Sequence, residues 1–210
     1  MSEHLVICLA RQFGSGGRTV GLAAAKAMNL NFFDKELLAV AAEKSGILPE
    51  LIERNDERAA SGLKNVLAGG ESIGKASSFS DYITYQPDDA VQNAIADAIR
   101  AAAAEGPCVI IGRCADYVLR GHPRMLSVFV HAPLEVRIKR VARLHNLPED
   151  DARALIRKTD RSRANYYSFY TDRDWGGIDN YHLALGTGRL EVEQAAELLR
   201  CAAKLYCGAD

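Results

Sequence analysis

Residues 5–19 read LVICLARQFGSGGRT, and this stretch decides the fold. It begins with an apolar run typical of a buried strand, passes through Gly14, Gly16 and Gly17, and leads into an alanine-rich segment with helical character. Backbone amides at a glycine-rich helix start form a site for anions, above all phosphate. The stretch therefore predicts a phosphate-binding loop, although such glycines also simply connect strands to helices.

The loop follows the pattern G-x-x-x-x-G-K-[ST] incompletely, because the lysine of that pattern is missing. Its backbone would surround phosphate oxygens, and the Thr19 hydroxyl would bind Mg²⁺ or phosphate. The residues that we expect to contact the cofactor are Arg11, Gly14, Ser15, Gly16, Gly17, Arg18 and Thr19.

Size and composition place limits on the rest of the chain. With 210 residues it is long enough for one well-buried core, so we expect a single domain over 1–210. The net charge of -1 gives no general attraction to nucleic acid or to an anionic membrane, and we expect neither as a partner. Five cysteines without a C-x-x-C pair indicate a reducing compartment, and residues 3 and 4 are not those of a basic leader. A cytoplasmic protein is expected.

The hydrophobic pattern alternates short apolar strands with amphipathic helices, which predicts an α/β fold with a parallel sheet covered on both faces. The alanine-rich helices could face either a core or a second copy of the chain, so a homo-oligomer stays open. The expected strands are the run from residue 5, then 32–34, 108–111, 125–131 and 181–185. The expected helices cover 20–28, 35–44, 49–58, 88–104, 134–144, 146–158 and 190–205.

One long segment, residues 63–87, lacks a regular pattern and is rich in glycine, serine and tyrosine. Compact domains seldom carry such a loop without a use for it. It is either a surface excursion or a mobile cover over a substrate, and the sequence favours neither.

Two polar residues lie at the ends of predicted strands, and the first of them, Arg113, is at the sheet edge where ligands bind in open α/β folds. Arg113 comes after the run 108–111, and its planar guanidinium suits phosphate oxygens, although a surface ion pair is the alternative. Asp34 ends the strand 32–34, where it would bind a substrate hydroxyl or base amine, or only cap the next helix.

Arginines also gather in the segment 153–163. On a helix, Arg153, Arg157 and Arg161 share one face, and Arg163 lies nearby. Phosphoryl transfer needs several positive charges around the moving group, and these arginines could supply them. A solvated basic face balanced by neighbouring aspartates is the ordinary alternative.

Together these features resemble the cytidylate kinase-like family, over most of the chain. The resemblance is carried by residues 11–18, by Phe32-Phe33-Asp34, by Ile111-Gly112-Arg113 against a D-G-R motif, by Asp160-Arg161-Ser162-Arg163 against an arginine-bearing lid, and by 181–190. In the ungapped register Gly17 stands at the lysine position, so the charge would come from Arg18 or from Arg11. A register shifted by one aligns Arg18 with the lysine but spoils the downstream spacing.

The resemblance implies a P-loop nucleoside monophosphate kinase: a three-layer sandwich around a parallel five-stranded sheet, with a substrate flap at about 46–88 and a lid at about 155–176. It implies ATP and Mg²⁺ as cofactors and nucleotides as substrates. Arg113 and Asp34 would hold the acceptor, and the catalytic charges would be Arg18, Arg157, Arg161 and Arg163. The acceptor-side serine and arginine usual after Asp34 are absent, and Ile111 replaces the first aspartate of D-G-R.

The expected function is ATP-dependent phosphoryl transfer to a nucleoside monophosphate, with a cytidylate-like acceptor first. One alternative is a nucleotide-binding sensor without catalysis, which the missing lysine favours. The other is a kinase for a non-nucleotide metabolite.

Overall fold

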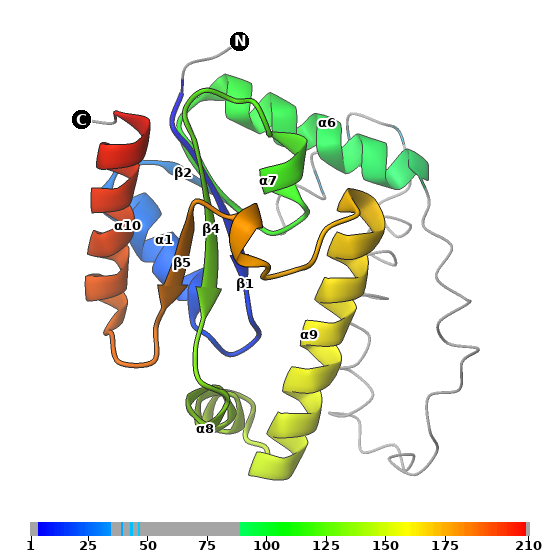
Figure 1. Ribbon diagram of the computed structural model, residues 1–210, viewed down its shortest axis with the longest axis vertical. Helices are drawn as coiled ribbons and strands as arrows, with labels where there is room; N and C mark the ends of the chain where they lie inside the picture. The colour runs from blue at the N-terminus through cyan, green and yellow to red at the C-terminus, as the bar shows by residue number, and fades with distance from the viewer. Residues whose placement is uncertain (1–3, 35–38, 40–42, 44–45, 47–88, 209–210) are drawn as a thin grey trace.

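The computed structural model describes residues 4–34, 39, 43, 46 and 89–208 (Figure 1). The expected helix over 49–58 and the segment 63–87 lie outside the described residues, as does most of the helix expected over 35–44. Everything below concerns the described part of the chain.

A five-stranded parallel sheet forms the centre, as the sequence predicts, and its strand order is β2-β3-β1-β4-β5. Strand β1 is central because its residues are apolar on both faces, so it can be covered from both sides. The strands are β1 (Val6–Arg11), β2 (Asn31–Phe33), β3 (Cys108–Ile111), β4 (Met125–His131) and β5 (Leu183–Gly186).

The two faces of β1 pack in two different cores, which makes the molecule a three-layer sandwich (Figure 1). Ile7 and Leu9 face helices α1 (Gly17–Ala27) and α10 (Val192–Cys207), while Val6 and Cys8 face α6 (Asp89–Glu105) and the short α7 (Ala115–Val118). Cys8 and Cys108 are buried free thiols, as their places in strands predict. In the described part of the chain, no helix has the length and apolarity to cross a membrane.

Helix α8 (Leu134–His145) lies beyond the carboxyl end of β4, and α9 (Glu149–Thr171) packs against it and then runs back along the side of the sheet (Figure 1). The expected end of the second helix near residue 158 is wrong, because α9 continues to Thr171 and closes on Asp172 in the left-handed conformation. The polar run 157–163 contains no glycine or proline, and the buried Tyr167 anchors the later turns in an aromatic cluster. Residues 155–171 of the expected lid are therefore part of one continuous helix.

Candidate functional site

The loop between β1 and α1 has the conformation that its glycines predict. Gly14 and Gly16 have φ of 77° and 83°, in the left-handed region that favours glycine. A Cβ on Gly14 would also lie only 2.7 Å from Cγ2 of Val141. Helix α1 starts at Gly17, whose amide donates to Ser15 Oγ at 3.3 Å. Thr19 lies exposed in the first turn of α1.

Side chains from outside the loop bind its backbone, and three of them are arginines. They fix the loop against α8, α9 and the segment after β5, and they bring positive charge to its border. The donor–acceptor pairs are Arg163 Nη1 to Arg11 O (2.9 Å), Arg137 Nη1 to Phe13 O (3.2 Å), Arg140 Nη1 to Gly14 O (2.9 Å), Thr187 Oγ1 to Ser15 O (2.5 Å) and Phe13 N to Asp160 Oδ1 (2.7 Å).

One of these groups, Asp160, has a structural role that the sequence does not reveal. Its carboxylate accepts from the Phe13 amide and forms an ion pair with Arg137 at 2.5 Å, and the two charged side chains are 17% and 9% exposed. The sequence places Asp160 among neutralising charges on a solvated face. In the structure it fastens α9 to the loop.

A pocket of about 310 Å³ opens beside the loop, at the carboxyl ends of β1 and β3. This is the edge where parallel sheets bind ligands. Four arginines line the pocket together with two aspartates and an aromatic wall of two tyrosines and a tryptophan. The lining residues are Ala10, Arg11, Arg18, Asp34, Gly112, Arg113, Cys114, Asp116, Thr159, Arg163, Tyr166, Tyr167 and Trp175.

Asp34 organises one side of the pocket. It is 6% exposed, and Arg18 Nε donates to its Oδ2 at 2.7 Å while Arg11 Nη2 lies 3.8 Å from its Oδ1. The guanidinium of Arg18 also lies 5.7 Å from the centroid of the Phe32 ring. Both candidates for the missing loop charge are therefore oriented by the same carboxylate, at the end of β2.

Three consecutive left-handed residues bring Arg113 to the pocket. Gly112, Arg113 and Cys114 have φ of 71°, 60° and 54° directly after β3. Residues other than glycine adopt this backbone conformation at a cost in free energy, and such strain is common at ligand sites. The turn places Arg113 and Asp116 in the same pocket lining.

Asp116 and Tyr167 are pocket residues that the sequence analysis missed. The Tyr167 hydroxyl donates to Asp116 Oδ2 at 2.7 Å, and both residues are buried. Burial raises the pKa of Asp116 above its usual range, against the opposing effect of the Tyr167 hydrogen bond. Asp116 lies in the four-residue helix α7, too short for a periodic pattern to reveal, and Tyr167 lies beyond the expected end of its helix.

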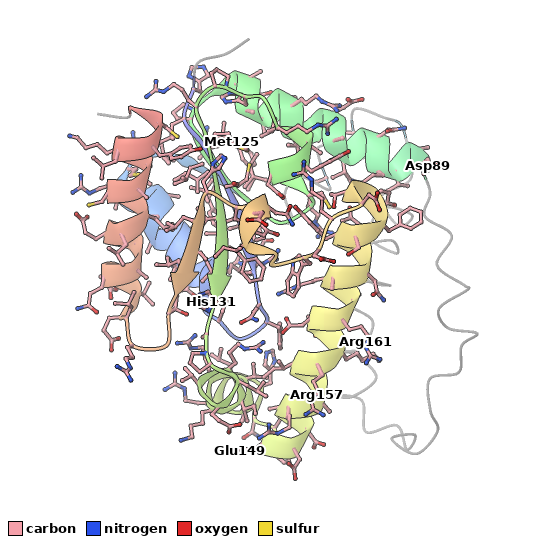
Figure 2. All side chains as sticks on the ribbon, in the orientation of Figure 1. Asp89, Met125, His131, Glu149, Arg157 and Arg161 are labelled. Atoms are coloured by element: carbon pink, nitrogen blue, oxygen red, sulfur yellow. The ribbon has the colours of Figure 1, made fainter. Side chains whose placement is uncertain are left out.

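Among the predicted arginines of α9, only Arg163 reaches the pocket. Arg157 and Arg161 are exposed, lie one turn apart (Figure 2), and do not line it. Arg153 pairs with Glu135 at 3.1 Å, so the shared face is at least partly an ordinary solvated one.

The sheet order and the loop after the first strand place the chain in the class of P-loop kinase folds, and solved structures agree. An uncharacterised protein from Eubacterium ventriosum superposes with a TM-score of 0.68 at 24% identity, over 95% of this chain and 98% of that one. A gluconokinase from Sinorhizobium meliloti gives 0.55 at 18% identity, covering 100% of both chains. A shikimate kinase from Bacteroides thetaiotaomicron gives 0.53 at 16%, over 95% and 98%. At these identities the likeness shows the fold alone.

The chain belongs to the cytidylate kinase-like family, whose sequence model matches residues 6–189. It is 31% identical over 111 residues to a cytidylate kinase from Methanopyrus kandleri, in a segment covering 49% of this chain and 58% of that protein. It is 27% identical over 122 residues to a cytidylate kinase from Haloarcula marismortui, covering 58% and 63%. The matched segments thus span less than two thirds of these relatives.

Proposed function

We propose that this protein is an ATP-dependent phosphotransferase acting on a small phosphorylated acceptor, with a nucleoside monophosphate of the cytidylate type as the first candidate. One observation carries the proposal: four arginines and two aspartates line a single pocket beside the glycine loop. In a chain whose net charge is -1, such an excess of cations is suited to an anionic ligand.

The glycine loop and the start of α1 would bind the ATP phosphates through backbone amides. Mg²⁺ commonly keeps several waters and takes its other ligands from phosphates and one or two protein oxygens. Thr19 fits that mode of binding, because its side chain is exposed in the first turn of α1, directly after the glycine loop. The ion would neutralise developing phosphate charge.

The acceptor would lie in the pocket with its phosphate against Arg113, Arg18 and Arg163 and with Asp34 holding the arginines in place. The aromatic wall and Asp116 would face the rest of the acceptor, where the carboxylate can accept a hydrogen bond from an amine or a hydroxyl. Arg157 and Arg161 would act only if the lid moved toward the phosphates. Catalysis would consist of positioning and charge stabilisation, without a covalent enzyme intermediate.

The test is an acceptor panel of CMP, dCMP, UMP, AMP and GMP, with gluconate and shikimate as non-nucleotide acceptors, each incubated with ATP and Mg²⁺ while ADP is measured. We expect turnover with at least one monophosphate and a preference for CMP or dCMP. Turnover with gluconate or shikimate alone would contradict the proposed phosphorylated acceptor but would support the phosphotransferase activity.

A second function is favoured by Gly17, which stands at the lysine position of the loop. A module that binds nucleotide without transferring phosphate would show saturable ATP binding by calorimetry and no ADP with any acceptor. That pair of results would contradict the enzymatic proposal.

A further inference from the structure

Gly17 has no room for a side chain. A Cβ built on it would lie 2.7 Å from Cβ of Arg11 and 3.1 Å from Cβ of Val130. Neither neighbour is the movable end of a long side chain, since both atoms are fixed to strands β1 and β4. A lysine at position 17 would therefore have to displace the backbone of β1, and Val130 adds a second close approach from β4.

Relative to the loop pattern, Arg11 and Gly17 have exchanged residue types. In the ungapped register, Gly16 matches the second glycine of G-x-x-x-x-G-K, which places Arg11 at the first glycine and Gly17 at the lysine. The chain thus has a cation where the pattern has a glycine, and a glycine where it has a cation. An arginine at position 11 and a lysine at position 17 would have their Cβ atoms only 2.7 Å apart, so the first carbons of the two side chains would overlap.

The guanidinium of Arg11 reaches the pocket. Its side chain is 21% exposed, lines the cavity, and has Nη2 3.8 Å from Asp34 Oδ1. It passes over Gly112, where an added Cβ would collide with its Nη1. Gly17 therefore leaves the space that the Cβ of Arg11 occupies, and Gly112, whose φ of 71° already favours glycine, lies beside its guanidinium.

Arg18 is less suited than Arg11 to replace the missing lysine. Its side chain is 59% exposed, and its Nε is held by Asp34 at 2.7 Å. Arg11 is more enclosed, and its carbonyl is fixed by Arg163 at 2.9 Å.

We propose that Arg11 is the loop cation of this protein: it supplies from strand β1 the phosphate-binding charge that the lysine of the pattern supplies from the helix start. The role in catalysis rests on the proposed function, whereas the steric exchange between Arg11 and Gly17 does not.

The steric part is tested by a double-mutant cycle on thermal stability. Gly17→Ala should lower Tm by roughly 2–10 °C, the range for overpacking a core in a chain of this size. In an Arg11→Gly background the same substitution should cost much less, because the colliding Cβ is gone. Equal losses in both backgrounds would contradict the exchange.

The functional part is tested with Arg11→Gly, Gly17→Lys and the double variant Arg11→Gly/Gly17→Lys, measuring ATP affinity by calorimetry and kcat in the acceptor assay. Arg11→Gly should lower kcat or ATP affinity about 100-fold, as loss of one charge-stabilising donor does. The double variant should regain at least tenfold of that loss, because the 2.7 Å contact with the Arg11 Cβ is gone and only the 3.1 Å approach to the Val130 Cβ remains. Gly17→Lys alone, which keeps Arg11, should show no gain over the wild type.

Arg200→Ala is the matched control, since it removes an exposed arginine on α10 and should leave both quantities unchanged. An Arg11→Gly variant equal to this control, or a double variant no better than Arg11→Gly, would overturn the proposal. If the wild type turns over no acceptor, the proposed function fails, and the exchange is still decided by ATP affinity and by the stability cycle.

Discussion

Asp34 shows how one residue can set the geometry of a whole site. Its buried carboxylate holds Arg18 at 2.7 Å and lies 3.8 Å from Arg11, so two cations depend on it for direction. Removing the charge of Asp34 takes a carboxylate partner from both guanidiniums, and their positive charges then repel each other without that shared neutralising group. A pocket that acts by positioning loses rate when its cations are misplaced, even if they remain charged.

We therefore predict that Asp34→Asn, which keeps the shape and removes the charge, lowers kcat/KM by about 10- to 100-fold. Steady-state kinetics with the best acceptor measures it. Asp97→Asn is the matched control, because Asp97 pairs with Arg100 at 2.7 Å on the surface of α6. Similar small effects of both substitutions would mean that Asp34 does not orient the pocket.

Asp116 has a second consequence at the residue scale, because burial raises its pKa. A carboxyl group whose pKa is higher in the folded protein favours folding when protonated, and this contribution is lost as the pH rises from its unfolded pKa through its folded one. Asp116→Asn cannot ionise and still accepts from Tyr167.

The free energy of unfolding of Asp116→Asn, relative to wild type, should therefore rise between pH 4 and pH 8. Urea unfolding at several pH values measures the difference. A difference that is constant with pH, or that falls toward pH 8, would contradict the raised pKa.

At the scale of elements, α9 is fastened to the loop by a few partly buried polar contacts. Asp160 binds both the Phe13 amide and Arg137, and Arg163 binds the Arg11 carbonyl while its guanidinium lies 5.6 Å from the centroid of the Phe13 ring. Movement of α9 away from the loop would have to break these contacts together. The helix and the loop therefore act as one unit in this conformation.

Asp160→Ala should cost about 3–5 kcal/mol of unfolding free energy, because it leaves the charge of Arg137 buried without its partner. Chemical denaturation measures the loss. Asp151→Ala, on the first turn of the same helix, should cost much less. Comparable losses for the two variants would refute a fastening role for Asp160.

Arg163 and Arg157 belong to the same helix but differ in place, since only Arg163 lines the pocket. Arg163→Ala should reduce kcat/KM at least tenfold more than Arg157→Ala does. Steady-state kinetics of the two variants at the same ATP concentration measures this difference in kcat/KM. A larger effect of Arg157→Ala would indicate a lid that closes further than this structure shows.

For the whole molecule, the sequence predicts the architecture better than the site. All five strands could be predicted, because each is a short apolar run between turn signals, and alternation with helices implies a parallel sheet. The glycine loop between β1 and α1 was predictable from its glycines and its context. Arg113 and Asp34 were predictable as residues at strand ends, where parallel sheets bind ligands.

What the sequence does not reveal depends on contacts between distant segments. Asp160 and Arg163 are only two polar residues in a charged run until α9 lies against the loop. The role of Gly17 is visible only once the Cβ of Arg11 is found beside it. Asp116 lies in the pocket because of the left-handed turn over residues 112–114, which no sequence pattern predicts. Local patterns determine the elements, and packing determines which charges meet.

The central claim is that an acceptor bound in the arginine-lined pocket receives a phosphoryl group from ATP bound at the loop. In the most direct measurement, the protein is incubated with Mg²⁺, ATP labelled at the γ-phosphate and each acceptor of the panel. The label transferred to the acceptor is then compared between the wild type and Arg113→Ala. The account predicts label on at least one monophosphate and a decrease of at least tenfold in the variant. Label that stays on ATP with every acceptor, in folded protein that binds ATP, would contradict it.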